Sequence, residues 1–330
     1  MKRLLAGVGK RRMEGLFVSL AIASLAGNAQ AQTYPAKPVR VIVPFEAGGR
    51  VDLAMRIIGK YMAGRWGQAV IVENRPGAGS NTGMAVVASS PPDGYTLASG
   101  ANPLSANVTL FKNMPFDPVT AFAPITLYYI DANALVVHPS FEVNSVAELI
   151  ALLKGKPKEY TYASSGNGTS LHLSAELFKS MAGVDVTHVP YRGVPQAMGD
   201  LMGGRVTMMF LGLSIATPFI TGGKLKGIAT TGEKRYSRLP NLPTVAEAGL
   251  KGFEASSWAG LLAPAGTPRP VVNAVRDVVV ASLNDRETRA SLEKYGFELV
   301  GNTPEQFAEI IKEEIVKWGA IIRATGAKVD

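Results

Sequence analysis

The sequence contains no cysteine among its 330 residues. Disulfide frameworks, thiolate metal sites and cysteine nucleophiles are therefore excluded. Histidine is scarce as well, because only His138, His172 and His188 are present, and their scattered positions do not give the spacing of a metal site. The sequence thus predicts neither a metal site nor a bound cofactor.

Apolar runs of the roughly 18 residues that a membrane helix needs are also lacking. The run from Leu16 to Ala26 is too short, and it follows a segment that contains five basic residues. The small-residue triplet Ala29-Gln30-Ala31 that comes next is typical of a signal-peptide cleavage site. We therefore expect a signal peptide over residues 1–31, cleavage after Ala31, and export to the periplasm of a bacterium.

Strong charge of one sign is absent once the predicted signal peptide is set aside. Residues 1–31 carry five basic residues and one acidic residue, so their removal lowers the formal net charge from +8 to +4. No basic run with interleaved aromatic residues follows in the remaining chain. Composition therefore gives no case for nucleic-acid binding, and it favours a soluble exported protein.

What the sequence does contain is one design repeated three times: an apolar strand, a glycine-rich loop and a helix. The strands are expected at 39–43, 69–73 and 160–163, and the loops follow at 44–52, 74–83 and 164–170. Glycine lets the backbone approach a ligand closely, and a helix N-terminus offers unpaired N–H groups and partial positive charge to an anion. Taken alone, the first unit is more typical of an ordinary strand-to-helix turn that binds nothing.

Strands and helices alternate along the rest of the chain, which predicts an α/β fold with mainly parallel sheets. Ligands of such sheets bind at the carboxyl ends of the strands. The polar, glycine-rich ends fall in two blocks, at about 40–102 and 160–193, and we therefore expect two lobes that face each other across a cleft. Further strands are expected at 95–99, 125–129, 134–137, 186–190, 206–211, 225–230 and 258–263, and helices at 145–153, 171–182, 197–202, 271–283 and 304–324, with a brief one within 239–249.

Motifs of the common catalytic centres are missing. The sequence contains no G-x-S-x-G nucleophile elbow, no Walker loop, no HExxH and no EF-hand loop. Many polar loops without a recognisable set of catalytic residues indicate a protein that binds a ligand without converting it, so the protein is not expected to be an enzyme. His172, beside Ser170, leaves open a secreted hydrolase that uses this histidine with a serine of the loop 164–170.

Several segments together resemble the tripartite tricarboxylate transporter receptors, also called Bug or TctC proteins. The similar segments are YPAKPVRVIVPFEAGGRVD (34–52), GQAVIVENRPGAGSNTG (67–83), PDGYTL (92–97), SSGNGTSLHL (164–173), VPYRG (189–193), LPTVAEAG (242–249) and WAGLLAPAGTP (258–268). They run over nearly all of the mature chain in the family's order. The resemblance implies a type II periplasmic binding protein fold with two doubly wound lobes and a ligand cleft between them. Lobe 1 would comprise residues 32–131 and 256–330, and lobe 2 residues 132–255.

The same resemblance implies a function. A receptor of this kind captures a small carboxylate (a dicarboxylate, an aromatic acid or an amino acid) by lobe closure. It would act as a monomer and deliver the acid to a two-subunit membrane permease of the tripartite tricarboxylate type. Two alternatives remain open from the sequence: the hydrolase-like enzyme, and a sensor that passes the ligand state to a membrane kinase.

The family's binding loops carry over to three loops of this sequence and two neighbouring positions. Hydroxyl and backbone N–H groups of these loops would donate to a ligand carboxylate, in part through water. The predicted ligand-binding residues are Phe45, Gly48, Gly49, Arg50 and Asp52 in the first loop, Gly79 and Asn81 in the second, Asn102 at the rim, Ser164, Ser165, Gly166, Gly168, Thr169 and Ser170 in the third, and Tyr191 beside it.

The first loop departs from the family pattern at Arg50. The family usually has F-P-P-G-G followed by a small residue, whereas this chain reads Phe45-Glu-Ala-Gly-Gly-Arg50. We hypothesise that Arg50 forms a bidentate pair with a ligand carboxylate. The alternatives are a pair with Glu46 or a solvent-exposed side chain. Asp52 is expected either to support the helix N-terminus or to contact a ligand amine or hydroxyl.

Overall fold

The computed structural model describes residues 34–328, so the predicted signal peptide lies outside the described residues. From Lys37 onward the chain forms one compact unit. Its strands are β1 (Val39–Val43), β2 (Val70–Asn74), β3 (Thr96–Ala101), β4 (Phe122–Val137), β5 (Thr161–Ser164), β6 (Thr187–Pro190), β7 (Met208–Gly212), β8 (Lys226–Thr230), β9 (Ser256–Pro264) and β10 (Glu298–Leu299). Its helices are α2 (Arg50–Trp66), α3 (Asn81–Ala88), α4 (Pro103–Leu110), α5 (Val146–Gly155), α6 (Ser170–Ala182), α7 (Val194–Met202), α8 (Leu213–Thr221), α9 (Arg269–Asn284), α10 (Arg286–Glu293) and α11 (Pro304–Thr325), with a 3₁₀ turn at Ala78–Ser80.

The strands form a mixed sheet in the order β2-β1-β3-β9-β4-β7-β5-β6, with β8 and β10 paired to β4. The two outer groups, β2-β1-β3 and β7-β5-β6, are each parallel. The strands β9 and β4 between them pair antiparallel to each other and to their neighbours. The α/β class is confirmed. The expectation of mainly parallel sheets is wrong for the middle strands, because β9 and β4 run against both groups.

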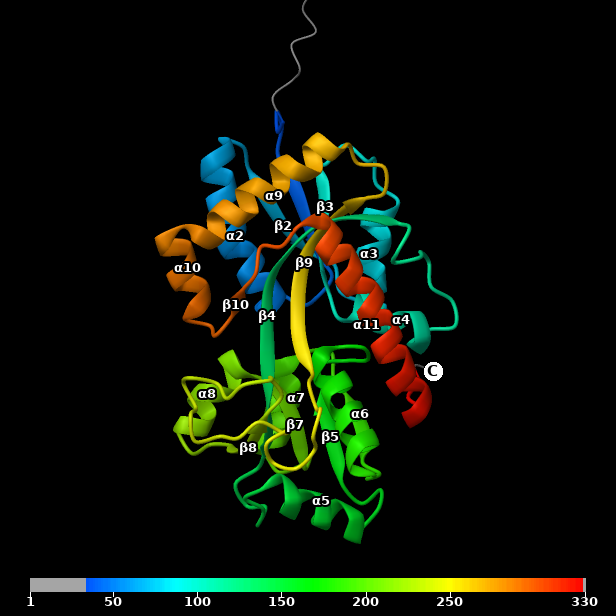
Figure 1. Cartoon of the computed structure of the whole chain (residues 1–330), viewed down its shortest axis with the longest axis vertical. Coiled ribbons are helices and arrows are strands. Elements are labelled where there is room, and N and C mark those ends of the chain that lie inside the picture. The colour runs from blue at the N-terminus through cyan, green and yellow to red at the C-terminus, as the bar shows by residue number, and fades with distance from the viewer. Residues whose placement is uncertain (1–33, 329–330) are drawn as a thin grey trace, which may run out of the picture. The chain divides into compact units, whose positions relative to one another are not determined.

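The long strand β4 connects these two groups, as Figure 1 shows, with β9 alongside it. Its first part pairs with β9 up to Ala132, opposite Ser256, and its last part pairs with β7 and β8. The separate strands expected at 125–129 and 134–137 are therefore parts of one strand. The partner change falls where the sequence predicts the lobe boundary, but the division into two lobes remains a prediction.

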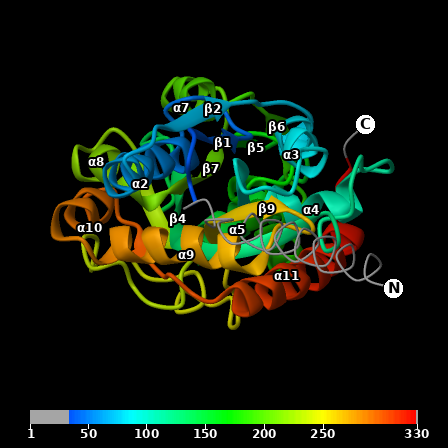
Figure 2. The same cartoon turned by 90° about the horizontal axis from the view of Figure 1, so that it is seen from above.

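Apolar side chains on these strands build the core. In β1 every residue except Arg40 is fully buried, as expected for a run rich in β-branched side chains. Helices α9 and α11 both pack against β4 and lie along one side of the strands (Figure 2). On α11, Phe307 reaches β9 so closely that a Cβ atom on Gly260 would lie 2.3 Å from its ring. Glycine at this position lets the helix and the strand meet.

Helix ends follow local sequence signals, with some exceptions. Ser145 caps α5 by accepting from the N–H of Glu148 at 3.1 Å, and Thr303 opens α11 with a capping box. The helix expected within 239–249 is wrong, because this proline-rich segment forms turns and a single bridge from Thr244 to Thr230. Helices α4, α8 and α10 were not expected. Within residues 34–328, every helix is too short or too polar to serve as a membrane-spanning segment.

Candidate ligand-binding site

The first predicted loop joins β1 to α2 and is folded around the carboxylate of Asp52. Its Oδ2 accepts from the backbone N–H of Gly48 at 2.9 Å, and Gly48 has a φ of +80°, where glycine is favoured. Asn74, at the end of β2, donates to the carbonyl of Phe45 and to Asp52 Oδ1, both at 3.0 Å. Asn74 was missed by the sequence analysis, although it directly follows a predicted strand.

Asp52 itself is buried, with only 3% of its surface exposed. Arg56, one helical turn later, donates through Nε to both carboxylate oxygens at 3.0 Å. Burial raises the pKa of Asp52, but the hydrogen bonds from Arg56, Gly48 and Asn74 outweigh it and bring the pKa below 3.8. Asp52 therefore stays ionised and holds the loop in shape, which favours the supporting role over direct contact with a ligand.

Arg50, the first residue of α2, forms an ion pair with Asp131 of β4. Its Nη2 also donates to Asn133 Oδ1 at 3.3 Å and to Ser170 Oγ at 3.2 Å. The partner is thus neither Glu46 nor solvent, the two alternatives to ligand contact that the sequence suggested. Asp131 and its neighbour Asn133 were missed, although two polar residues within the apolar run of β4 are a visible signal.

The second loop is held by a residue that lies far from it in sequence. Asn107 of α4 donates through Nδ2 to the carbonyl of Gly79 at 2.7 Å and to Asn81 Oδ1 at 2.8 Å. Gly79 has a φ of +60°, and Asn81, the first residue of α3, is 4% exposed. Asn107 was not predicted, because the helix that carries it was not expected.

The third loop forms its own hydrogen bonds. Ser164, fully buried at the end of β5, accepts from the N–H of Gly166 at 3.1 Å, and Thr169 Oγ1 donates to the Gly166 carbonyl at 2.8 Å. Gly166 and Gly168 both have positive φ, +117° and +75°. These residues shape the loop, and the partly exposed Ser165 lies within it.

Beneath this loop lie two stacked histidines. The rings of His172 and His188 are 4.4 Å apart, and His188 stacks in turn on Tyr162 at 4.6 Å. His172 Nδ1 accepts from the N–H of Gly168 at 3.1 Å, and His188 Nε2 lies 2.7 Å from Ser164 Oγ. Burial lowers the pKa of His172 to about 4 and that of His188 to about 3. Both rings are therefore neutral and support the loop from below.

The predicted rim residue Asn102 is buried, with 1% of its surface exposed. Its Nδ2 donates to the carbonyl of Ser256 at 3.1 Å, and its Oδ1 accepts from the N–H of Trp258 at 3.1 Å. Both ends of the amide thus connect the end of β3 to β9. This arrangement favours a structural role for Asn102, and its contact with a ligand remains a prediction.

Tyr191 follows β6 and touches the third loop through its backbone. Its N–H donates to the carbonyl of Ser164 at 3.0 Å, and its hydroxyl donates to Asp200 Oδ2 at 2.5 Å. Burial and the hydrogen bond to Asp200 raise the pKa of Tyr191 to about 12. Tyr191 is partly exposed, and its contact with a ligand remains a prediction.

Two side chains bring the three loops together. Arg50 connects the first loop to Ser170, where the third loop ends. Asn107 connects the second loop to the third, since a Cβ atom on Gly168 would lie only 2.6 Å from its Oδ1. At the helices that follow, within the described part of the chain, the N-cap residues Gly49, Ser80 and Thr169 make no side-chain hydrogen bond to the helix. In this part of the chain, no N-cap side chain therefore satisfies the first N–H groups of α2, α3 and α6, although the N–H of Thr82 in α3 donates to the Gly77 carbonyl at 3.3 Å. Helix N-termini of this kind suit an anion.

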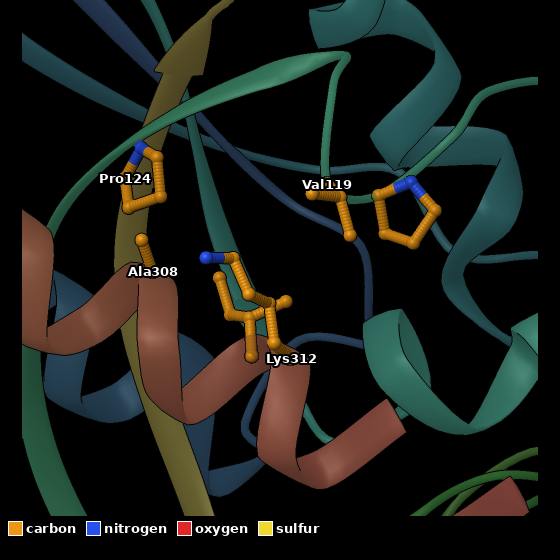
Figure 3. Close-up of a pocket in the computed structure, with 6 residues that line it drawn as sticks. Val119, Pro124, Ala308 and Lys312 are labelled. Atoms are coloured by element: carbon orange, nitrogen blue, oxygen red, sulfur yellow. The ribbon is translucent and has the colours of Figure 1, made fainter. Parts of the chain in front are cut away.

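A small hollow lies elsewhere, between the start of β4 and α11. Figure 3 shows Val119, Pro124, Ala308 and Lys312 around it, and its volume is about 50 Å³. None of the predicted ligand-binding residues lines this hollow. Across residues 34–328, no group of three or more histidine, aspartate or glutamate side chains is arranged to hold a metal ion. The converging loops remain the candidate site.

Comparison with known proteins gives consistent matches. The family model for the tripartite tricarboxylate transporter family receptor, TctC, matches residues 54–327. Protein BugT of Bordetella pertussis is 32% identical over 331 residues, which covers all of this chain and 99% of BugT.

Solved structures resemble this protein over nearly the same length. A protein of R. palustris solved with adipate has a TM-score of 0.84 and 35% identity, and the match covers 90% of this chain and all of that one. MatC of Rhodopseudomonas palustris, solved with malate, has a TM-score of 0.82 and 31% identity, with 88% and 100% covered. These likenesses confirm the periplasmic binding protein fold.

Proposed function

The chain belongs to the tripartite tricarboxylate transporter receptor family, and we propose that it is a periplasmic receptor that captures a small carboxylate and releases it unchanged. The family consists of substrate-binding receptors rather than enzymes. The predicted signal peptide supports the periplasmic location. The finer steps of the proposal are closure of two lobes on the acid and its delivery, by a monomeric receptor, to a two-subunit membrane permease.

One observation carries the proposal: three glycine-rich loops converge, and each precedes a helix whose N-terminus has no side-chain cap among residues 34–328. A carboxylate oxygen accepts hydrogen bonds from such N–H groups, and the partial positive charge at the helix ends stabilises it. Ser165 and Ser170 add hydroxyl donors, and Asn81 adds an amide. Similar structures were solved with adipate and malate, which supports a dicarboxylate-sized acid as the ligand.

The contacts between loops support closure around the acid. Arg50 of the first loop bonds Asp131 and Asn133 of β4 and Ser170 of α6, so elements assigned to different lobes already touch. The proposed boundary between the lobes lies at Ala132 and Ser256, where the β4–β9 pairing ends. Opening and closing would bend these two strands at that point.

The hydrolase alternative is less well supported. His172, the expected base, accepts from the N–H of Gly168, and within the loop 164–170 the serine that meets a histidine is Ser164, which pairs with His188. Ser164 is fully buried beneath its loop. Among the described side chains, no carboxylate hydrogen-bonds to either histidine, so the third member of a hydrolytic triad is missing.

A thermal-shift screen of the purified chain from residue 32 tests the proposal. Carboxylic acids that include adipate and malate are matched with neutral amides of the same carbon skeleton. A ligand that binds only the folded receptor stabilises it by RT ln(1 + L/Kd), where L is the free ligand concentration, so at least one acid should raise the melting temperature in a concentration-dependent way while its amide does not. Mass spectrometry of the recovered acid should show no conversion.

Two results would contradict the proposal. One is a melting temperature that no acid in the screen raises. The other is conversion of the bound acid to a product at a rate that scales with protein concentration, which would favour the enzyme instead.

A further inference from the structure

The ion pair of Arg50 with Asp131 places two opposite charges inside the candidate site. The side chain of Asp131 is 0% exposed and that of Arg50 is 11% exposed. The guanidinium lies directly against the backbone at the end of β7, since a Cβ atom on Gly212 would fall 2.4 Å from its Nη1. Neither charge is therefore compensated by bulk water, and each depends on its partner.

The donors to Asp131 are the Arg50 guanidinium and the backbone N–H of Ala132, and within the described chain they leave one carboxylate oxygen without a partner. Its Oδ1 is buried and has no hydrogen-bond partner among the described residues, and the same holds for the hydroxyls of Tyr129 and Tyr236. Tyr129 and Asp131 point to the same face of β4, since side chains alternate along a strand. Burial raises the pKa of Tyr129 and of Tyr236, and the charge of Asp131 adds to this in both, whereas Arg50 opposes it at Tyr129 and Arg238 opposes it at Tyr236. Buried polar atoms normally have partners, so three without one in the same region indicate a group that binds there.

The charge balance limits what that group can be. If a ligand carboxylate pairs with the guanidinium of Arg50 in place of Asp131, Asp131 becomes a buried carboxylate without a counter-charge. This state is strongly unfavourable. A plain dicarboxylate would add negative charge and make this worse. A ligand that also brings an ammonium group supplies the missing cation, and it provides donors for Asp131 Oδ1 and the tyrosine hydroxyls.

We propose that the site takes an ammonium-bearing carboxylate, with its carboxylate on Arg50 and its ammonium on Asp131. This inference rests on the proposed receptor function and narrows its ligand class. The ligand exchanges one internal ion pair for two external ones, so no buried charge is left alone. Arg50 and Asp131 both belong to proposed lobe 1, but the Arg50 guanidinium also contacts Asn133 and Ser170 of proposed lobe 2, so the ligand would lie where the two lobes meet.

Matched probes test the inference by isothermal titration at pH 7.5. Each pair has one carbon skeleton with and without the ammonium group: L-aspartate and succinate, L-glutamate and glutarate, 2-aminoadipate and adipate. In at least one pair, the ammonium-bearing member should bind the unaltered chain at least about tenfold more tightly, as expected for a desolvated charge pair.

Variants separate the role of Asp131 from general damage. Asp131→Asn should reduce the ratio of affinities within that pair to near one. Arg50→Gln combined with Asp131→Asn removes both charges and keeps the region neutral, so it controls for misfolding of the single variant. The matched control is Asp185→Asn, which removes an exposed carboxylate outside the site and should preserve the ratio.

The outcomes are distinguishable. If succinate, glutarate and adipate bind as tightly as their ammonium-bearing partners, or if Asp131→Asn preserves the preference, the inference is wrong and the receptor function stands. If no probe of either kind and no other acid binds, the proposed function fails and the inference fails with it.

Discussion

Burial acts on ionisable residues of this site in opposite directions. Burial raises the pKa of Asp131 to about 6, although the charge of Arg50 lowers it. Burial lowers the pKa of His172 to about 4 and of His188 to about 3. Between about pH 4 and pH 6, Asp131 holds a proton in the folded state that it loses on unfolding, while the two histidines gain protons on unfolding. Acidification therefore favours folding through Asp131 and opposes it through the histidines.

The contribution of Asp131 to stability can be isolated with Asp131→Asn. A pKa raised from 3.8 to about 6 corresponds to about 3 kcal/mol. We expect the free energy of unfolding of the unaltered chain, minus that of Asp131→Asn, to rise by up to about this amount as the pH falls from 7 to 4. The histidine contributions cancel in this difference. Urea denaturation at stepped pH measures it, and a difference that stays constant across the range would contradict the assignment.

At the scale of elements, close approach of helix and strand depends on glycine. A Cβ atom on Gly260 of β9 would lie 2.3 Å from the Phe307 ring and 2.9 Å from the carbonyl of Thr126. Gly64, in an exposed turn of α2, has no atom within 4 Å of the same position. The two glycines therefore differ in their role, although both lie inside regular elements.

Alanine substitutions should separate these roles. Gly260→Ala forces a methyl group into the contact between α11 and β9, and we expect a loss of about 1–3 kcal/mol in the free energy of unfolding. Gly64→Ala fills open space within a helix and should gain about 0.5–1 kcal/mol. Urea denaturation of both variants measures these changes in the free energy of unfolding. If the Gly260→Ala chain is as stable as the unaltered one, α11 and β9 can move apart to accommodate the methyl group, which would contradict the prediction.

The sequence predicts some elements well and others poorly, for physical reasons. Runs such as 39–43 and the loops after them are encoded locally, by β-branched residues followed by glycine. The continuity of β4 is not encoded locally. The polar residues Asp131 and Asn133 are typical of a turn in sequence, and only the folded chain shows the buried partners that place them in a strand. Likewise, the sequence shows that Arg50 departs from the family pattern of its loop. Its partner Asp131 lies 81 residues away, so the pairing can be recognised only in the folded chain.

At the scale of the whole compact unit from Lys37 onward, the sheet arranges the site. Two parallel groups of strands present their glycine-rich loops, and the long antiparallel strands β4 and β9 connect the groups. Arg50 and Asn107 then hold the loops against one another. The local units predict where loops occur, whereas their convergence follows from the topology of the sheet.

The location of a bound acid tests this account most directly. A crystal structure should be determined with the acid that gives the largest thermal shift. We expect carboxylate oxygens within about 3 Å of backbone nitrogens at the start of at least two of the helices α2, α3 and α6. An acid bound beside α11 instead, or one in the site that contacts none of these helix N-termini, would contradict it.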